Sequence, residues 1–233
     1  LVLFAATEIG PYAYSYNDNE WFLLSGISAP DQTYWTLEYV SDINYFDTAP
    51  YYGYGRAEHR LGQVLRQVER KEFFLSTKIG RLLSPLHAGI PASDEYRSGG
   101  LPFLPAFDYS YEGTMRSIED SHQRLGLASI DMVSIHDVDL YTHKEPDVVE
   151  NYFREAMEGA YVALDELRSA GIIRAIGCGL NDAISCSRFL RAGDFDYMML
   201  AGRYTLLDQT SLDHLIPYCE KNNISLLLGG VFN

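Results

Sequence analysis

Short apolar runs alternate with longer amphipathic stretches along most of this chain of 233 residues. A short apolar run is typical of a buried strand, whereas apolar residues at i, i+3, i+4 and i+7 form one face of a helix. The runs predict seven strands, at residues 1–6, 44–48, 73–78, 130–136, 172–178, 196–201 and 224–228. Each of the first six is followed by a helical segment, so the pattern predicts regular alternation of strands and helices.

The helical segments have recognisable faces and ends. The segment 56–69 carries one apolar stripe, formed by Leu61, Val64, Leu65 and Val68. Other helices are predicted near 31–40, from an N-cap at Ser110 to residue 125, and over 153–167, with Gly171 placed to end it. Two more are predicted, a short one that ends near Gly193 and one around 212–219 with a kink at Pro217. Residues 80–110 are rich in Pro, Gly and Ser and are predicted to form a long loop.

Strict alternation of strands and helices requires a parallel sheet with helices outside it. The strands are short and apolar, and no glycine-rich dinucleotide-binding turn follows the first of them. Both features favour a (β/α)8 barrel over a doubly wound sheet. An eighth strand–helix unit is missing, so we expect one α/β domain over residues 1–233, a TIM-type barrel truncated after its seventh strand. The chain starts without Met, and we expect that it is trimmed at its amino end as well.

Polar side chains stand at the carboxyl ends of four consecutive predicted strands. Asp47, Lys78 and His136 end three successive strands, and Asn181 lies just past the next one. Tyr52 lies in the loop after Asp47. Active sites of (β/α)8 barrels lie at this end of the strands. We therefore expect these five side chains to meet at one rim.

These residue types suit proton transfer to a carbonyl oxygen. A tyrosine titrates at about pH 10, and a nearby ammonium group lowers its pKa by favouring the phenolate. A carboxylate keeps the lysine charged and fixed, and a neutral histidine can orient the carbonyl. Together they predict protonation of a carbonyl oxygen as hydride reaches its carbon. The sequence contains no metal-ligand spacing and no Ser or Cys nucleophile motif, so we expect no metal.

Each of these residues also has a purely structural interpretation. Asp47 alone could be a turn residue, Lys78 a surface lysine and His136 a hydrogen-bonded core histidine. Asn181 could cap the helix that follows it. With Tyr52, Lys78 and His136 in register beside it, Asp47 favours the catalytic interpretation of that group, while for Asn181 both interpretations stay open.

The segment DTAPYYGYGRAEHRLG (47–62) resembles the D-T-A-x-x-Y-G-x-G-x-x-E-x-x-L-G signature of the aldo-keto reductases. FFLSTKIG is similar to that family's strand with the catalytic Lys, IDMVSIHD to its strand with the catalytic His, and GIIRAIGCGLN to the segment whose Asn binds the nicotinamide carboxamide. The resemblance runs from about residue 42 to 233. LAGRYTLLDQ and ISLLLGGVFN look closest to the branch of fucose, galactose and threo-aldose 1-dehydrogenases and pyridoxal dehydrogenases.

This resemblance implies a role for each matched residue. Tyr52 would be the general acid/base and Lys78 the partner that lowers its pKa, while Asp47 would pair with Lys78. His136 would orient the substrate carbonyl. The implied cofactor is NADP(H) or NAD(H), bound extended across the rim by Asn181, Gly229, Gly230, Phe232 and Asn233. The implied substrate is a small carbonyl compound or a sugar, contacted by Tyr51 and Tyr54, unless these two rings only pack in the loop.

Some positions depart from the wider family. Ala201 stands where a Gln contacts the carboxamide, and Gly229 stands where an aromatic ring stacks under the nicotinamide. Both changes fit the sugar-dehydrogenase branch. Residues 7–30 do not resemble the family's first loop, and the segment for an adenosine 2'-phosphate is absent, which leaves NAD or NADP open. The alternatives to an active enzyme are a weak or inactive fragment of this fold and a cofactor-binding regulatory subunit.

Composition narrows the class of partners. The net charge of −14 and the lack of an apolar run of roughly 18 residues predict that the protein binds neither nucleic acid nor membrane. Cys178, Cys186 and Cys219 are too few and too irregular for a disulfide framework or a zinc site. They predict buried thiols in a protein of the reducing cytoplasm. The sequence gives no indication of the oligomeric state.

Overall fold

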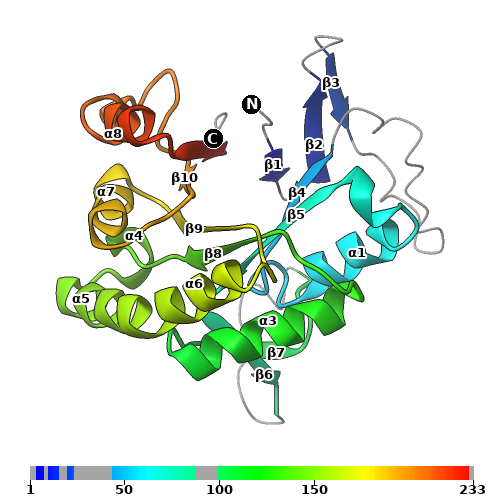
Figure 1. The fold of residues 1–233 in the computed structure, drawn as a ribbon. Coiled ribbons are helices and arrows are strands. Elements are labelled where there is room, and N and C mark those ends of the chain that lie inside the picture. The colour runs from blue at the N-terminus through cyan, green and yellow to red at the C-terminus, as the bar shows by residue number, and fades with distance from the viewer. Residues whose placement is uncertain (1–3, 8–9, 16–19, 24–43, 88–98, 231–233) are drawn as a thin grey trace.

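A computed structural model of the protein describes residues 4–7, 10–15, 20–23, 44–87 and 99–230. Within these ranges one sheet has nine strands in the order β3-β2-β1-β11-β10-β9-β8-β5-β4, and β6 and β7 form a second, two-stranded sheet (Figure 1). The strands are β1 (Phe4–Thr7), β2 (Gly10–Ser15), β3 (Glu20–Leu23), β4 (Tyr45–Asp47), β5 (Phe74–Ile79), β6 (Arg81–Pro85), β7 (Phe103–Phe107), β8 (Met132–His136), β9 (Ala175–Leu180), β10 (Tyr197–Ala201) and β11 (Ser225–Gly229).

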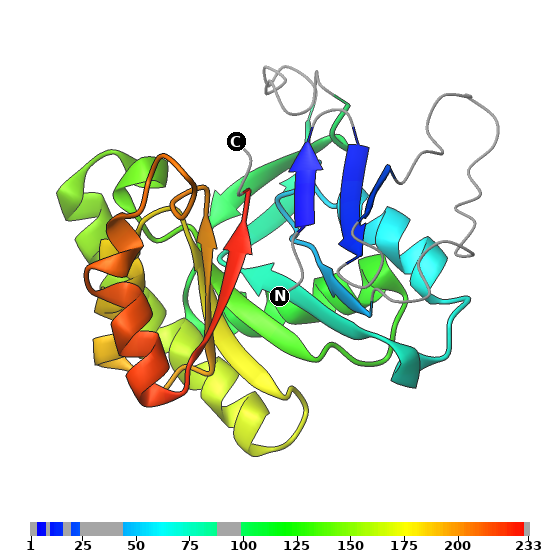
Figure 2. The same cartoon turned by 90° about the horizontal axis from the view of Figure 1, so that it is seen from above.

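Six consecutive strands of the large sheet confirm the expected barrel-type architecture. β4, β5, β8, β9, β10 and β11 lie side by side, each parallel to the next, and β1 pairs parallel with β11. These seven strands correspond to the seven predicted from sequence. The sheet is curved and carries its helices on the outer side (Figure 2), which is the arrangement of a partial (β/α)8 barrel. Within the described residues it is open, with β4 at one end.

The helices follow the strands as the sequence pattern predicts. They are α1 (Arg56–Leu65), α3 (Tyr111–Leu125), α4 (Leu140–His143), α5 (Pro146–Glu155), a π-helical turn (Ala156–Ala160), α6 (Tyr161–Ser169), α7 (Ala183–Ala192) and α8 (Leu215–Asn222), with short 3-10 turns at Arg70–Glu72 and Thr210–Leu212. Ser110 is the N-cap of α3, and its side chain accepts a hydrogen bond from the Gly113 N–H, as predicted. The helix expected near 31–40 lies outside the described residues.

Two antiparallel pairs interrupt the expected alternation. β2 pairs antiparallel with β1 and with β3, inside the segment 7–30 that was expected to be a loop. Its sequence is rich in Tyr, Trp and Phe, which favour strands. The prediction of a continuous loop over 80–110 is also wrong, because β6 and β7 form a hairpin there. Proline is tolerated in this hairpin, since each strand of a two-stranded sheet has an unpaired outer edge.

The expected kink at Pro217 is also wrong. Helix α8 begins at Leu215, after a separate 3-10 turn that ends at Leu212. Pro217 therefore lies in the first turn of α8, where the backbone N–H groups have no partner inside the helix and the missing N–H costs nothing. The periodic apolar residues of 212–219 belong to two elements rather than to one bent helix.

The two faces of the sheet differ in chemistry. The outer face is mostly apolar, and residues such as Leu75, Val133 and Ile176 are fully buried beneath the helices, with Thr77, which bonds Glu58 of α1, as an exception. The inner face carries polar side chains at alternate positions, including Ser76, Lys78 and Ser134. This period of two follows from the pleat of a strand. It directs the polar residues of successive strands toward one shared interior.

The three cysteines are buried and free, as predicted. Burial raises the pKa of both the Cys178 and the Cys186 thiol, so neither is a reactive thiolate at neutral pH. Among the helices of the described ranges, we find none with the length and apolar character needed to cross a membrane.

Candidate active site

The carboxyl ends of β4 and β5 bring Asp47 and Lys78 into direct contact. Asp47 is the last residue of β4 and pairs in register with Ser76 of β5, so Lys78 lies two residues further along on the same face. The Lys78 ammonium donates to Asp47 Oδ2 and, at 2.9 Å, to the Thr48 carbonyl oxygen. Lys78 is 1% exposed. The interpretation of Lys78 as a surface lysine is therefore wrong.

Burial and charge act in opposite directions on this ion pair. Burial alone would lower the pKa of Lys78, but the Asp47 carboxylate and Tyr52 outweigh it, and the pKa lies above its ordinary value. Lys78 is therefore a fixed cation at physiological pH. A buried cation that is paired on one side is available to stabilise a second negative charge nearby.

The hydroxyl groups of Ser76 and Tyr45 form a hydrogen-bonded chain that supports the Asp47 carboxylate. Ser76 donates its hydroxyl proton to Asp47 Oδ1. Because that proton is committed to the carboxylate, Ser76 Oγ is left to accept from the Tyr45 hydroxyl, which lies 2.8 Å away. The two oxygens of Asp47 thus have separate partners, Ser76 for one and Lys78 for the other. This arrangement fixes the carboxylate orientation.

The loop after β4 turns the chain sharply so that Tyr52 faces back over the strands. Gly53, Tyr54 and Gly55 all have positive φ, at 60°, 52° and 92°. Glycine adopts this left-handed region without steric cost, which explains the two glycines of the GYG run. The Ala57 N–H donates to the Tyr52 carbonyl oxygen at 3.2 Å, so the residue is anchored at the start of α1.

Tyr52 lies against both Lys78 and His136. The Lys78 Nζ atom is 4.8 Å from the centre of the Tyr52 ring, and the Tyr52 and His136 rings meet edge to face with centres 5.9 Å apart. Tyr52 remains 36% exposed, so the ring is accessible to a small molecule. The sequence prediction that these residues meet at one rim is matched by this geometry.

The pKa of Tyr52 shows two competing influences. Burial raises the pKa, and Lys78, through its charge and a hydrogen bond, is the main influence that lowers it. Asp47 acts in the same direction as burial. The net pKa lies above the ordinary tyrosine value, so the lowering by Lys78 that the sequence predicts is present but is outweighed in this structure.

His136 is buried at the end of β8 and is neutral. Burial lowers its pKa well below the ordinary value, and the positive charges of Lys78 and Arg81 add to that effect. Arg81 Nη1 lies 3.4 Å from His136 Nδ1. Asp137 Oδ1 lies 3.5 Å from the other ring nitrogen, Nε2. A neutral imidazole in this position can donate one hydrogen bond to an oxygen.

Asn181 is held by two carboxylates rather than serving as a helix cap. Its Nδ2 donates to Asp137 Oδ1 at 3.0 Å and to Asp139 Oδ2 at 2.9 Å. The cap of α7 is Asp182, which accepts from the Ser185 N–H, so the capping interpretation of Asn181 is wrong. Because both amide protons point at acceptors, the orientation of the amide is fixed. Its oxygen is the group that can accept a hydrogen bond from a ligand such as a carboxamide.

The structure describes some of the remaining predicted site residues and not others. Gly229 ends β11 next to Ala201, and Gly230 follows with φ 62°, while Phe232 and Asn233 lie outside the described residues. A Cβ on Gly229 would lie at ordinary contact distance, 3.9 Å, from Ala201 Cα. Tyr54 is 4% exposed and packs against Tyr51, with ring centres 5.7 Å apart, which leaves it little surface to offer a substrate.

Arg81 and Asp137 are charged residues near the site that the sequence analysis did not single out. Arg81 Nη2 pairs with Asp137 Oδ2 at 2.8 Å, and the same carboxylate accepts from Asn181. Asp137 itself has a positive φ of 58°, which Asp tolerates better than most residues. The signal in the sequence was position alone, since Asp137 comes one position, and Arg81 three positions, after the end of a predicted strand.

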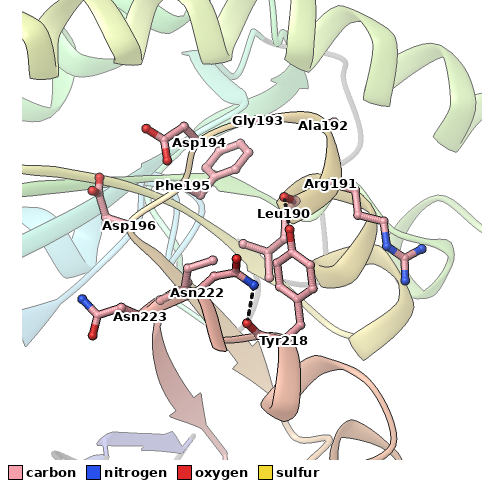
Figure 3. Close-up of a pocket in the computed structure, with 11 residues that line it drawn as sticks. Leu190, Arg191, Ala192, Gly193, Asp194, Phe195, Asp196, Tyr218, Asn222 and Asn223 are labelled. Atoms are coloured by element: carbon pink, nitrogen blue, oxygen red, sulfur yellow. Dashed lines mark hydrogen bonds between the residues drawn. The ribbon is translucent and has the colours of Figure 1, made fainter. Parts of the chain in front are cut away.

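A surface pocket lies far from this rim, at the amino ends of β10 and β11 (Figure 3). Several of its polar groups are used within the protein. Asp196 binds Arg168 and the Ile176 N–H, and Asn222 donates to the Tyr218 carbonyl oxygen. No group of three His, Cys, Asp or Glu side chains in the described ranges could hold a metal ion.

Comparison with known proteins places this geometry in a family. A sequence profile of the Aldo/keto reductase family matches residues 24–231. The chain is 43% identical over 202 residues to the pyridoxal 4-dehydrogenase of Microbacterium luteolum, covering 83% of this chain and 58% of that protein. It is 36% identical over 215 residues to the D-threo-aldose 1-dehydrogenase of a Pseudomonas species, covering 87% and 60% respectively.

Solved structures agree on the fold. An aldo-keto reductase from Bacillus halodurans in its holo form superposes with a TM-score of 0.58 at 22% identity, over 81% of this chain and 53% of that one. The chain thus spans about 60% of the length of the curated relatives described above. From the profile match, the two relatives and the shared fold together, we conclude that this chain belongs to the aldo/keto reductase family.

Proposed function

We propose that the protein is an oxidoreductase that transfers hydride between a nicotinamide cofactor, NAD(H) or NADP(H), and the carbonyl or hydroxyl carbon of a small substrate. The observation that carries the proposal is the chain of contacts from Asp47 through Lys78 to Tyr52, with the neutral His136 beside it. Family membership supports the same reaction class.

In the reduction direction, Tyr52 gives its proton to the substrate oxygen. The phenol carries this proton at neutral pH, because a tyrosine titrates at about pH 10, and the proton moves as the substrate oxygen becomes basic. Lys78 then stabilises the phenolate that remains, because it is a cation already fixed by Asp47. His136 donates a hydrogen bond to the same oxygen and so orients the carbonyl. In the oxidation direction Tyr52 takes the proton back.

The cofactor supplies the hydride and accepts it in the reverse direction. Asn181 fits a nicotinamide carboxamide because its amide orientation is fixed by Asp137 and Asp139 and its oxygen is left to accept an N–H. The lack of a side chain at Gly229, beside Ala201, supports the close approach of a ring, and Gly230 is assigned to the cofactor on resemblance. Phe232 and Asn233 are assigned to the cofactor on resemblance alone.

For the substrate, we propose an aldose or another small polar aldehyde. The relatives' names, pyridoxal 4-dehydrogenase and D-threo-aldose 1-dehydrogenase, support this class. Tyr51 is half-buried and its ring lies over Arg81, which supports its assignment as a substrate contact. We further propose that the protein works in the cytoplasm, because its three cysteines are free.

A cofactor-binding protein with weak or no turnover is the second candidate. It is favoured by one observation, that burial outweighs Lys78 and leaves the pKa of Tyr52 above its ordinary value. Turnover of L-fucose, D-galactose, pyridoxal and an aromatic aldehyde tests the first proposal, and activity on the aromatic aldehyde alone would reject the sugar branch. Quenching or enhancement of NADH and NADPH fluorescence without turnover would favour the second candidate.

The variant Tyr52→Phe tests the assigned proton donor. It removes the hydroxyl and keeps the ring, so we expect turnover to be abolished while cofactor affinity stays nearly the same. Retention of more than about a tenth of the activity, a barrier change below ~1.4 kcal/mol, would refute the role of Tyr52. Tyr111→Phe at the start of α3 makes the same exchange at a half-buried tyrosine whose hydroxyl bonds Glu166, outside the contacts described for the site, and serves as the control.

A further inference from the structure

Arg81 is a buried cation that reaches the site from outside the large sheet. It is the first residue of β6 in the separate hairpin, and it is 6% exposed. Its guanidinium carbon lies 4.2 Å from the centre of the Tyr51 ring and 4.5 Å from that of Phe107. Asp137 Oδ2 binds Nη2 at 2.8 Å. Two rings and one carboxylate therefore fix the direction of the remaining N–H groups.

One of those N–H groups faces His136. Arg81 Nη1 lies 3.4 Å from His136 Nδ1, a long hydrogen bond. A guanidinium has only donors, so Nδ1 must present its lone pair to Arg81. In a neutral imidazole the proton then resides on Nε2. A protonated His136 would have donors on both nitrogens and would lose this contact with Arg81.

The ring cannot satisfy the same donor after a flip. The opposite edge of the His136 ring faces Gly179, where a Cβ would lie 3.6 Å from Cδ2. A flip would turn Nδ1 toward the Gly179 backbone carbon and turn a C–H toward Arg81. The other charged and titratable groups around the ring are Lys78, Tyr52, Asp137 and Asp139. Of the two carboxylates, Asp137 has an oxygen within 4 Å of a ring nitrogen, and that nitrogen is Nε2.

We propose that Arg81 is a positioning residue that holds His136 in the neutral tautomer with the proton on Nε2, and that Asp137 holds Arg81 in place for this purpose. The Nε2 proton faces Asp137 Oδ1 at 3.5 Å in this structure, a long contact, and is the one His136 would donate to a substrate oxygen. The proposal deepens the proposed function and rests on it for its catalytic meaning. The tautomer itself can be measured without any turnover.

Nitrogen-15 NMR of the histidine-labelled chain at neutral pH is the test, because a protonated and an unprotonated ring nitrogen have well-separated shifts. His136→Asn identifies the signal of this ring among the six histidines. In the unmodified chain we expect Nδ1 to be unprotonated and Nε2 protonated. A protonated Nδ1 in that spectrum would overturn the proposal, whatever happens to any variant.

Variants separate positioning from simple packing. Arg81→Met keeps much of the contact with the two rings and removes the donors, so we expect a mixture of tautomers, and Arg81→Lys restores a donor and should recover part of the Nε2–H form. Arg116→Met, at an exposed arginine of α3, is the matched control and should change nothing. An unchanged tautomer in Arg81→Met would refute the proposal.

In an active enzyme Arg81→Met should lower kcat at least about tenfold, because a wrong histidine tautomer removes the hydrogen bond to the reacting oxygen, and should leave the KM for the cofactor nearly unchanged. A fall in kcat with an unchanged tautomer would mean that Arg81 acts only through packing, which also refutes the proposal. If the unmodified chain shows the expected tautomer but no turnover, the positioning role of Arg81 is supported and the proposed function is wrong.

Discussion

Glu58 is the buried carboxylate that ties the loop of Tyr52 to the strand of Lys78, and its removal should destabilise the protein strongly. Glu58 is fully buried in the first turn of α1. Its Oε1 accepts from Thr77 Oγ1 of β5 at 2.8 Å, and its Oε2 accepts from Arg124 Nε of α3 at 2.6 Å. One side chain therefore joins three elements around the candidate site.

The variant Glu58→Gln keeps the size of the side chain and removes its charge. If the amide oxygen keeps the Thr77 bond, the amide NH2 faces the Arg124 guanidinium, and both groups are donors. Breaking a buried ion pair on one side costs about 3–5 kcal/mol, because the remaining charge is uncompensated. Arg124 also donates to Ser121 and its side chain is 14% exposed. Water can therefore reach it, and we expect a loss near the lower end, about 3 kcal/mol.

Urea unfolding measures this loss. With a slope of about 3 kcal/mol per molar urea, the midpoint should fall by about 1 M at an unchanged slope. Glu119→Gln, the same exchange on an exposed position of α3, should shift it very little. The double variant Glu58→Met with Arg124→Met removes both charges and should recover most of the loss. A fall of less than about 0.3 M for Glu58→Gln would refute the reasoning.

Three further predictions concern the rim itself. Lys78→Met should raise the pKa of Tyr52 further and lower kcat by about a hundredfold or more at nearly constant cofactor affinity, which the pH profile of turnover would check. Asn181→Ala should weaken cofactor binding by about 1 kcal/mol, roughly fivefold, in a fluorescence titration. The pKa of His136 is lowered in the folded state, so below about pH 6.5 the unfolded chain binds a proton that the folded chain does not, and stability should fall as the pH falls. The slope of the unfolding midpoint between about pH 7 and pH 5 should be smaller in His136→Asn.

The strands and the meeting of Asp47, Lys78 and His136 could be predicted because both follow from short-range rules. An apolar run of strand length predicts a strand, and parallel strands place their carboxyl ends at one edge. Registers such as Asp47 opposite Ser76 then bring residues from distant positions together. No knowledge of individual side-chain contacts was needed for that step.

The role of Arg81 could not be predicted, because it depends on a hairpin that the composition concealed. The proline and glycine content of residues 80–110 favoured a loop. Arg81 is directed toward the site by the pairing of β6 with β7, which the sequence did not predict. The same limit applies to the partners of Asn181. Its two carboxylates, Asp137 and Asp139, follow a different strand, and one of them depends on a left-handed backbone at Asp137.

The side chains at the rim are held in place because polar side chains in the interior beneath them are hydrogen-bonded to one another. Ser134 and the Tyr197 hydroxyl lie 2.8 Å apart under the site, and a Cβ on Gly177 would lie 2.6 Å from the Tyr197 carbonyl oxygen, so the tyrosine occupies space that a larger residue at Gly177 would fill. The pair of Tyr45 and Ser76 supports Asp47 in the same way. A buried polar group without a partner is costly, so each hydroxyl has few alternative positions. The interior therefore limits the freedom of the carboxylate, and through it that of the ammonium and the phenol above.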